Sequence, residues 1–207
     1  MIVKIKICGI TNFEDALNAS RLGADALGFV FVENSPRYIK PHDAAHIINK
    51  LPPFINKVGL FVDPSKQEVE DAARIANFDL LQFHGDESEG FCNQFNLPYI
   101  KAISVKTDVN LLEYSRQYAS ASALLLDAYS EEARGGTGKT FDWNLIPKEG
   151  SIPLIVAGGL NNENIADLLR QVMPYAVDVS GGVEISKRQK DCKKMEDFIL
   201  GVRNATL

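Results

Sequence analysis

Short apolar runs recur along the whole chain, and Gly, Pro, Asn or Asp residues bound each of them. The runs are rich in Val, Ile, Leu and Phe, a profile that is typical of strands buried on both faces. They span residues 2–8, 26–31, 57–62, 80–84, 99–104, 123–127, 154–157 and 176–180. The pattern therefore predicts eight buried strands.

Between most of these runs, apolar residues recur with the spacing of an amphipathic helix. The predicted helices span residues 13–22, 43–49, 66–77, 87–96, 109–119, 163–172 and 194–202. Asn12 is a suitable N-cap for the first of them, with Glu14 and Asp15 in its first turn. The helical pattern is weakest after the sixth strand, where only residues 143–146 could be helical.

Strict alternation of strands and helices implies right-handed crossovers and a parallel sheet. Eight such units in 207 residues favour a compact (β/α)8 barrel, the TIM barrel, and a doubly wound open sheet is the alternative. No shift in composition and no low-complexity linker divides the chain. We therefore expect residues 1–207 to form a single barrel domain.

In such a barrel, catalytic residues lie at the carboxyl ends of the strands, and phosphate usually binds at the loops after strands seven and eight. Polar residues and glycines gather at these points of the sequence. They are Cys8, Arg37, Asp63, His84, Asp127, Gly158, Gly159, Ser180, Gly181 and Gly182. We expect the functional site at this end of the barrel.

The composition excludes several classes of protein. A formal net charge of −5 does not favour a nucleic-acid partner, whose usual footprint is a basic face. No segment approaches the roughly 20 apolar residues of a membrane span, and lysines interrupt the first apolar run where a signal peptide would be continuous. Cys8, Cys92 and Cys192 fit neither a disulfide framework nor a zinc pattern, so we expect a cytoplasmic protein without a metal.

Two glycine-rich turns, Gly158-Gly159 and Ser180-Gly181-Gly182, follow the seventh and eighth predicted strands. Glycine lets backbone N–H groups approach a phosphate, and a helix that starts nearby adds a favourable partial charge. Each could be a tight turn only. Their joint position favours a phosphate site.

A further glycine-rich segment, residues 134–140, reads Arg-Gly-Gly-Thr-Gly-Lys-Thr and partly matches a P-loop. Ala133 stands where the P-loop pattern requires its first glycine, which argues against a nucleotide triphosphatase. We expect instead a flexible loop over the barrel mouth that orders on ligand binding.

Cys8 and Asp127 are the candidates for proton transfer. A free buried cysteine is more often inert, but Cys8 ends a strand on the same face as Lys6, whose positive charge would favour the thiolate. Asp127 follows four apolar residues, and a carboxyl in such surroundings favours its protonated form. Asp127 could therefore be a general acid, or it could simply cap a loop.

Three further side chains carry expectations. Arg37, in a loop with a proline, is suited to a planar carboxylate, although it could be a solvated surface residue. His84 could contact a substrate or be a hydrogen-bonded histidine of the rim. Lys6 and Asp178 share the barrel-facing phase, and we expect them to pair inside the barrel because an unpaired buried charge is costly.

Several blocks, in order along the whole chain, carry a resemblance. They are KICGIT at residues 6–11, GFVF at 28–31 with SPRY at 35–38, QFHG at 82–85, GTGKTFDW at 136–143, AGGL at 157–160 and DVSGGVE at 178–184. Together they closely resemble the phosphoribosylanthranilate isomerase family of tryptophan biosynthesis. One departure is Gly181, where the family more usually has a second Ser.

The resemblance implies an Amadori rearrangement of N-(5-phospho-β-D-ribosyl)anthranilate to 1-(2-carboxyphenylamino)-1-deoxy-D-ribulose 5-phosphate, without a cofactor. It implies that Cys8 is the general base, Asp127 the general acid and Arg37 the carboxylate-binding residue. The partner would be this small phosphosugar, and the enzyme would be a monomer or a homodimer.

Two other functions compete with this interpretation. A different phosphosugar enzyme of the same fold would need a metal-binding His and Asp set, or a Lys/Glu pair, and the sequence shows neither at clear positions. A barrel that has lost catalysis could act as a binding protein, but the presence of both Cys8 and Asp127 argues against that.

Overall fold

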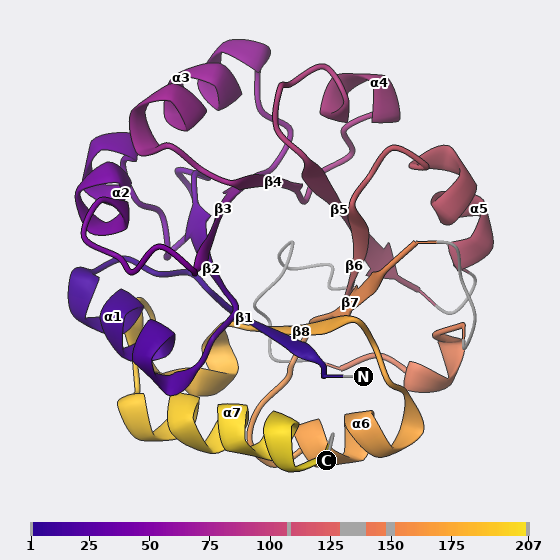
Figure 1. The fold of residues 1–207 in the computed structure, drawn as a ribbon. Helices are drawn as coiled ribbons and strands as arrows, with labels where there is room; N and C mark the ends of the chain where they lie inside the picture. The colour runs from indigo at the N-terminus through magenta and orange to yellow at the C-terminus, as the bar shows by residue number, and fades with distance from the viewer. Residues whose placement is uncertain (1, 107–108, 129–139, 148–151, 206–207) are drawn as a thin grey trace.

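Eight parallel strands close into a barrel in the computed structural model, which describes residues 2–106, 109–128, 140–147 and 152–205. The strands are β1 (Lys4–Cys8), β2 (Ala26–Val30), β3 (Asn56–Phe61), β4 (Leu80–Phe83), β5 (Tyr99–Val105), β6 (Ala123–Ala128), β7 (Leu154–Val156) and β8 (Ala176–Val179). They neighbour one another in chain order, and β1 pairs with β8 to complete the ring (Figure 1). The predicted (β/α)8 barrel is confirmed, and the open sheet is excluded.

An outer layer of helices surrounds the strands (Figure 1). These are α1 (Phe13–Leu22), α2 (Pro41–Ile48), α3 (Lys66–Ala76), α4 (Glu89–Cys92), α5 (Leu111–Gln117), α6 (Ile165–Gln171) and α7 (Cys192–Ala205), with short 3-10 helices η1 (Trp143–Leu145) and η2 (Gly181–Val183). None of the helices in the described part of the chain has both the length and the apolar character that a membrane span needs.

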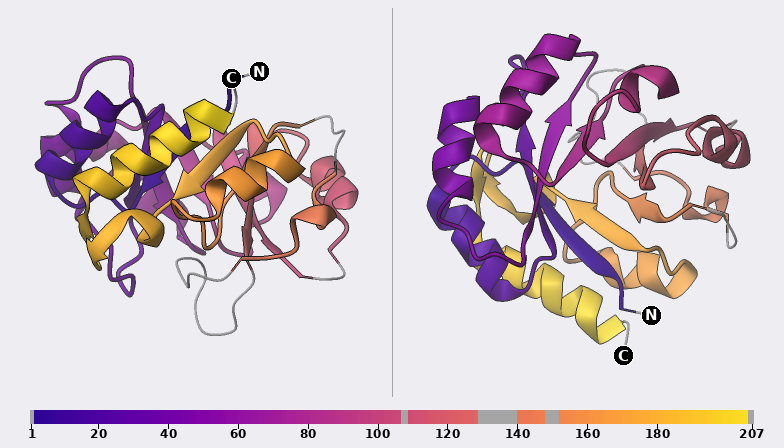
Figure 2. Two further views of the ribbon diagram at one scale, coloured as in Figure 1. Left: turned by 90° about the horizontal axis from the view of Figure 1, so that it is seen from below. Right: turned by 45° about the horizontal axis from the view of Figure 1, so that its top comes forward.

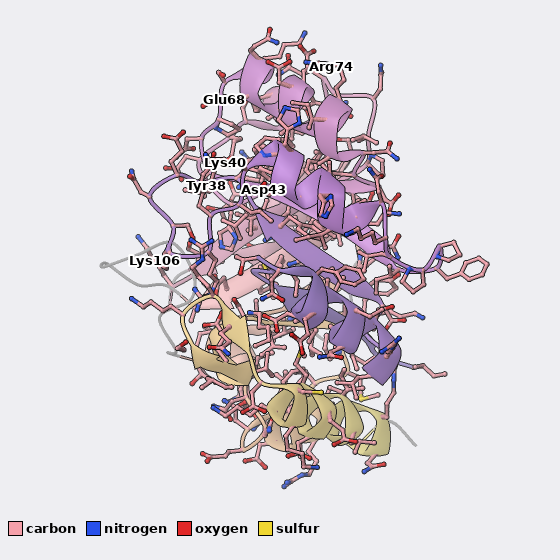
Figure 3. The ribbon with its side chains drawn as sticks, turned by 90° about the vertical axis from the view of Figure 1, so that its left-hand side faces the viewer. Tyr38, Lys40, Asp43, Glu68, Arg74 and Lys106 are labelled. Carbon is pink, nitrogen blue, oxygen red and sulfur yellow. The ribbon has the colours of Figure 1, made fainter. Side chains whose placement is uncertain are left out.

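Side chains of the expected types begin two of these helices. The Asn12 side chain accepts a hydrogen bond from the Asp15 amide at the start of α1, as predicted. Ser65 and Glu68 form a reciprocal capping box at the start of α3. In Figure 3, Glu68 and Arg74 lie toward opposite ends of α3 on the outer surface.

The two largest apolar clusters among the described residues follow from the alternation of side chains along each strand. One fills the space between the strands and the helices and contains large residues such as Phe29, Phe83 and Phe198. The other fills the barrel interior with smaller residues, among them Ala102, Leu125 and Ile155. A packed interior leaves room for a site only where the strands end.

The structure corrects two local expectations. The helix predicted over residues 87–96 is reduced to the single turn α4, because the Glu87 carboxylate turns inward and accepts hydrogen bonds from the Asp63 and Gly85 amides. The sequence analysis also missed a small hairpin after β8, formed by β9 (Glu184–Ser186) and β10 (Gln189–Lys190).

Asp25, just before β2, links segments that are far apart in the sequence. Its carboxylate accepts hydrogen bonds from Lys4 Nζ at 2.9 Å, from the Ile5 amide at 2.9 Å and from Arg203 Nη2 at 3.0 Å. The start of β1 and the end of α7 are therefore held together, and Figure 2 shows the two chain ends side by side.

Candidate active site

A cavity of about 480 Å³ opens where the strands end. Nine of the ten residues that the sequence analysis named at this end of the barrel line the cavity. These are Cys8, Arg37, His84, Asp127, Gly158, Gly159, Ser180, Gly181 and Gly182. Asp63 is not among the lining residues, since its Oδ1 accepts a hydrogen bond from the Asp86 amide within the neighbouring loops.

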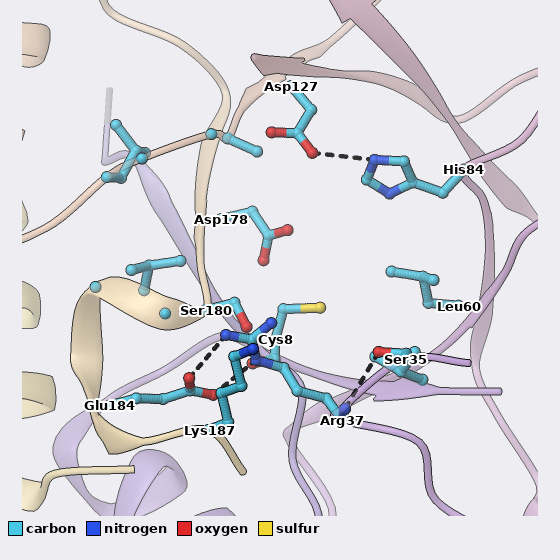
Figure 4. Close-up of a pocket in the computed structure, with 18 of the residues that line it drawn as sticks. Cys8, Ser35, Arg37, Leu60, His84, Asp127, Asp178, Ser180, Glu184 and Lys187 are labelled. Atoms are coloured by element: carbon cyan, nitrogen blue, oxygen red, sulfur yellow. Dashed lines mark hydrogen bonds and ion pairs between the residues drawn. The ribbon is translucent and has the colours of Figure 1, made fainter. Parts of the chain in front are cut away.

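Cys8 is the last residue of β1, and its sulfur points into the cavity (Figure 4). Gly28 on β2 makes room for the sulfur, because a Cβ at that position would lie 2.7 Å from Sγ. Burial raises the pKa of the Cys8 thiol, and the ammonium groups of Lys6 and Lys190 only partly offset that effect. Lys6 thus favours the thiolate as expected, but the pKa remains above its ordinary value.

Lys6 and Asp178 form the predicted buried ion pair, with Nζ and Oδ1 2.9 Å apart. The two residues are register partners on β1 and β8, so the pair lies across the line where the barrel closes. Burial lowers the pKa of Lys6, but the charges of Asp178 and Cys8 outweigh it and hold the pKa above its usual value. Removing one partner from such a pair costs about 3–5 kcal/mol.

Asp127 faces the cavity from β6, and its carboxylate meets His84 (Figure 4). His84 Nε2 lies 3.1 Å from Asp127 Oδ2, and His84 Nδ1 lies 3.1 Å from the amide nitrogen of Gln82. With the Gln82 amide in this orientation, its nitrogen donates to Nδ1, and Nε2 is then the ring nitrogen that donates to Asp127. Among the residues that the structure describes, none donates a hydrogen bond to Asp127 Oδ1, so this oxygen can hold a proton.

Arg37 reaches the cavity from the loop after β2 and contacts Glu184. Its Nε and Nη2 donate to the two carboxylate oxygens at 2.8 and 2.7 Å. The same carboxylate pairs with Lys190 at 2.9 Å. Hydrogen bonding to Glu184 raises the pKa of Arg37. Two cations share one carboxylate, so this cluster of Arg37, Lys190 and Glu184 carries a net positive charge.

The glycine-rich turns after β7 and β8 pack directly on each other. A Cβ on Gly182 would overlap the Leu160 carbonyl oxygen, so only glycine permits this approach. The expected helix starts are weaker than predicted, because α6 begins only at Ile165 and Ser180 leads into the short η2. The structure therefore offers backbone amides at these turns rather than the end of a long helix.

Glu184 and Lys190 are site residues that the sequence analysis missed. Their partner Arg37 lies 147 positions from Glu184, and no spacing rule connects residues so distant. Lys187, on the same hairpin, also lines the cavity. The glycine-rich loop predicted over residues 134–140 lies, apart from Thr140, outside the described residues. No cluster of three metal-ligating side chains occurs among the residues that the structure describes.

Several named proteins are similar to this chain in sequence and in fold. The family model for N-(5'-phosphoribosyl)anthranilate (PRA) isomerase matches residues 5–200. The N-(5'-phosphoribosyl)anthranilate isomerase of Nitrosomonas eutropha is 51% identical over 204 residues, which cover 99% of this chain and 98% of the relative. That of Pseudomonas fluorescens is 53% identical over 201 residues, which cover 97% and 98%.

Solved structures of phosphoribosyl anthranilate isomerases are also similar to this chain. The phosphoribosyl anthranilate isomerase of Thermotoga maritima is 41% identical and superposes with a TM-score of 0.90, over 98% of this chain and 99% of the other. A phosphoribosyl anthranilate isomerase in complex with reduced 1-(o-carboxyphenylamino)-1-deoxyribulose 5-phosphate is 38% identical, with a TM-score of 0.87 over the same shares. The chain belongs to the N-(5'-phosphoribosyl)anthranilate isomerase family.

Proposed function

We propose that this phosphoribosylanthranilate isomerase transfers protons with Cys8 as its general base and Asp127 as its general acid. One observation carries the assignment: the two side chains face each other across a single cavity that also contains the glycine-rich turns and Arg37 (Figure 4). A base and an acid that act on different atoms of one sugar must come from separate walls, and β1 and β6 provide them.

The reaction begins with opening of the ribose ring. Asp127 donates its proton to the ring oxygen, and the bond between this oxygen and C1 breaks. The lone pair of the anthranilate nitrogen forms a double bond to C1, which gives an iminium cation. The hydrogen bond from His84 to Oδ2 leaves Oδ1 as the donor oxygen of the carboxyl group.

The second proton transfer uses Cys8. The iminium acidifies the proton on C2, the Cys8 thiolate removes it, and the electrons of that bond form an enolamine while nitrogen regains its lone pair. The enolamine then takes a proton at C1 and loses one from the C2 hydroxyl, giving the ketone. Lys6 supports the thiolate against the effect of burial, and each positioned proton transfer is worth about 10²–10⁴-fold.

The two charged groups of the substrate, its phosphate and its carboxylate, are assigned to different parts of the cavity. The phosphate is placed at the turns formed by Gly158, Gly159, Ser180, Gly181 and Gly182, where backbone amides can donate to it. The anthranilate carboxylate is placed at Arg37, because the cluster with Glu184 and Lys190 retains a net positive charge. Fixing both ends holds C1 and C2 between acid and base.

The test of this arrangement is a Gly182→Ala variant. The new Cβ would meet the Leu160 carbonyl oxygen, so the two turns must move apart and the phosphate amides lose their alignment. We expect KM for phosphoribosylanthranilate to rise about tenfold or more, with a smaller change in kcat, because the binding contact is lost in ground and transition states alike. Fluorescence of the substrate follows the turnover.

Gly90→Ala is the matched control, since a Cβ on Gly90 would have no neighbour within 4 Å. Its KM should equal that of the wild type, and inorganic phosphate should inhibit it equally. Weaker inhibition by inorganic phosphate is expected for Gly182→Ala alone. An unchanged KM and unchanged phosphate inhibition in Gly182→Ala would place the phosphate elsewhere.

We propose further that the protein is a homodimer joined at the amino ends of its strands. The Thermotoga maritima relative is a dimeric protein of which monomers have been generated. In this chain, exposed large apolar residues gather just before strands: Ile2 before β1, Phe54 before β3, and Met173 and Tyr175 before β8. Phe54 is 99% exposed, and burial of its ring against a second copy would lower the free energy of the assembly.

A Phe54→Glu variant should therefore be monomeric in sedimentation velocity at concentrations where the wild type sediments as a dimer. Leu200→Glu changes an exposed apolar residue on α7 instead, and it should leave the dimer intact. A monomeric wild type, or dissociation by both variants equally, would contradict this interface. We also propose a cytoplasmic location, since Cys8, Cys92 and Cys192 are free and a reducing compartment keeps free thiols reduced.

A further inference from the structure

A lysine lies buried on the outer side of the barrel wall, away from the cavity. Ile100 and Ala102 of β5 face the barrel interior, while Tyr99 and Ile103 face the helices. Lys101 therefore points outward beneath the helices, where its side chain is only 3% exposed. A buried ammonium is costly unless it is paired and hydrogen-bonded, and none of the proposed chemistry uses this one.

The contacts of Lys101 converge on the segment that carries His84. Its ammonium donates to the carbonyl oxygens of Gly85 at 2.8 Å, of Ala102 at 2.9 Å and of Phe83 at 3.4 Å. It also pairs with Glu87 Oε2 at 3.3 Å. The residues before and after His84 are thus both bound through their carbonyl groups.

Glu87 holds the same segment through its amides. Its carboxylate accepts from the Gly85 amide at 2.9 and 3.1 Å and from the Asp63 amide at 2.8 Å. The Tyr118 hydroxyl in turn donates to the Glu87 carbonyl oxygen at 2.9 Å. Both backbone groups of Gly85 are therefore engaged by one buried ion pair, Lys101 by the carbonyl and Glu87 by the amide.

The side chain of His84 leaves this segment on the other side and enters the cavity. There its Nε2 meets Asp127 Oδ2 (Figure 4). We propose that the Lys101–Glu87 pair is a positioning device: it fixes the backbone at residues 83–85, and through His84 it sets the orientation of the Asp127 carboxyl. This inference rests on the proposed role of Asp127 as general acid.

The experiment is a double-mutant cycle between Glu87→Gln and His84→Ala. Glutamine keeps the shape of Glu87 but places a neutral group beside the Lys101 ammonium. We expect kcat to fall about 10- to 100-fold, because displacements of about 1 Å are worth this much, while KM stays near the wild-type value. In the His84→Ala background the same substitution should change kcat by less than about twofold, since the effect passes through His84.

Two further variants separate positioning from folding stability. Asp25→Asn removes a carboxylate with a similar set of backbone and cationic partners at the opposite end of the barrel. It should lower stability in urea without lowering kcat. Glu87→Gln combined with Lys101→Met removes both charges, so it should fold even if the single variant does not, and its kcat should still be reduced.

The outcomes distinguish this inference from the function it rests on. An inactive wild type, or full activity in Asp127→Asn, would overturn the proposed acid. If the wild type is active and depends on Asp127, then a wild-type kcat in the double-charge variant would overturn the positioning role alone. Effects of Glu87→Gln and His84→Ala that simply add would overturn it too, because a merely structural ion pair acts independently of His84.

Discussion

Replacing Cys8 with alanine is expected to lower kcat by about 10²–10⁴-fold, because the C2 proton then has no positioned base. The structure gives a reason to expect little else to change. Cys8 contributes a small side chain beside Gly28, and the Lys6–Asp178 pair remains in place without it. Consumption of freshly prepared phosphoribosylanthranilate, followed by fluorescence, measures the effect.

Cys92→Ala is the control for this experiment. Cys92 is also buried and free, but it lies on α4 in the outer core, where burial raises the pKa of its thiol to about 12. The Cys92→Ala variant should have the kcat of the wild type. Inhibition by inorganic phosphate should persist in Cys8→Ala, which shows that the site is intact. Turnover that survives in Cys8→Ala would move the base to another residue of the cavity.

Replacing Asp127 with asparagine should have an effect of the same size, about 10²–10⁴-fold in kcat, for a different reason. Asparagine has the shape of aspartate, and its carbonyl oxygen can still accept the His84 hydrogen bond, so KM should change little. The amide cannot deliver a proton to the ring oxygen, and the ring stays closed.

The same substitution at Asp25, which lies at the opposite end of the barrel, controls for loss of a carboxylate as such. It should retain the wild-type kcat. If Asp127→Asn raised KM and left kcat unchanged, Asp127 would be a binding residue and the acid would be another group. Equal losses in both aspartate variants would indicate damage to the fold.

The strand positions were predictable because each strand is buried on both faces, which produces apolar runs that helices interrupt. A contact between neighbouring strands could be predicted in one case only. Lys6 and Asp178 were expected to pair because burying an unpaired charge is costly. Helix ends were less accurate. The segment after β4 has a helical pattern, but the Glu87 carboxylate accepts hydrogen bonds from the Gly85 and Asp63 amides, and the helix is only the single turn α4.

The candidate site was predictable as a set of strand ends, because a parallel barrel brings all carboxyl ends to one face. The contacts between its side chains were not. The pairing of Arg37 with Glu184 depends on a hairpin that the sequence pattern does not reveal. Lys101 is a single charged residue within an apolar run, and only the fold shows that its ammonium reaches the backbone beside His84.

Closure of the barrel between β1 and β8 also sets when the site can exist during synthesis. Cys8 and Lys6 leave the ribosome early, whereas Ser180 and Asp178, which contact them, follow 172 positions later. Contacts this far apart in the chain form only after the intervening loop has been closed. On a nascent chain that lacks β8, the Cys8 thiol therefore has no Lys6–Asp178 ion pair beside it. The barrel closes only once β8 has been made, so a shorter chain would carry the proposed base without the opposite part of its site.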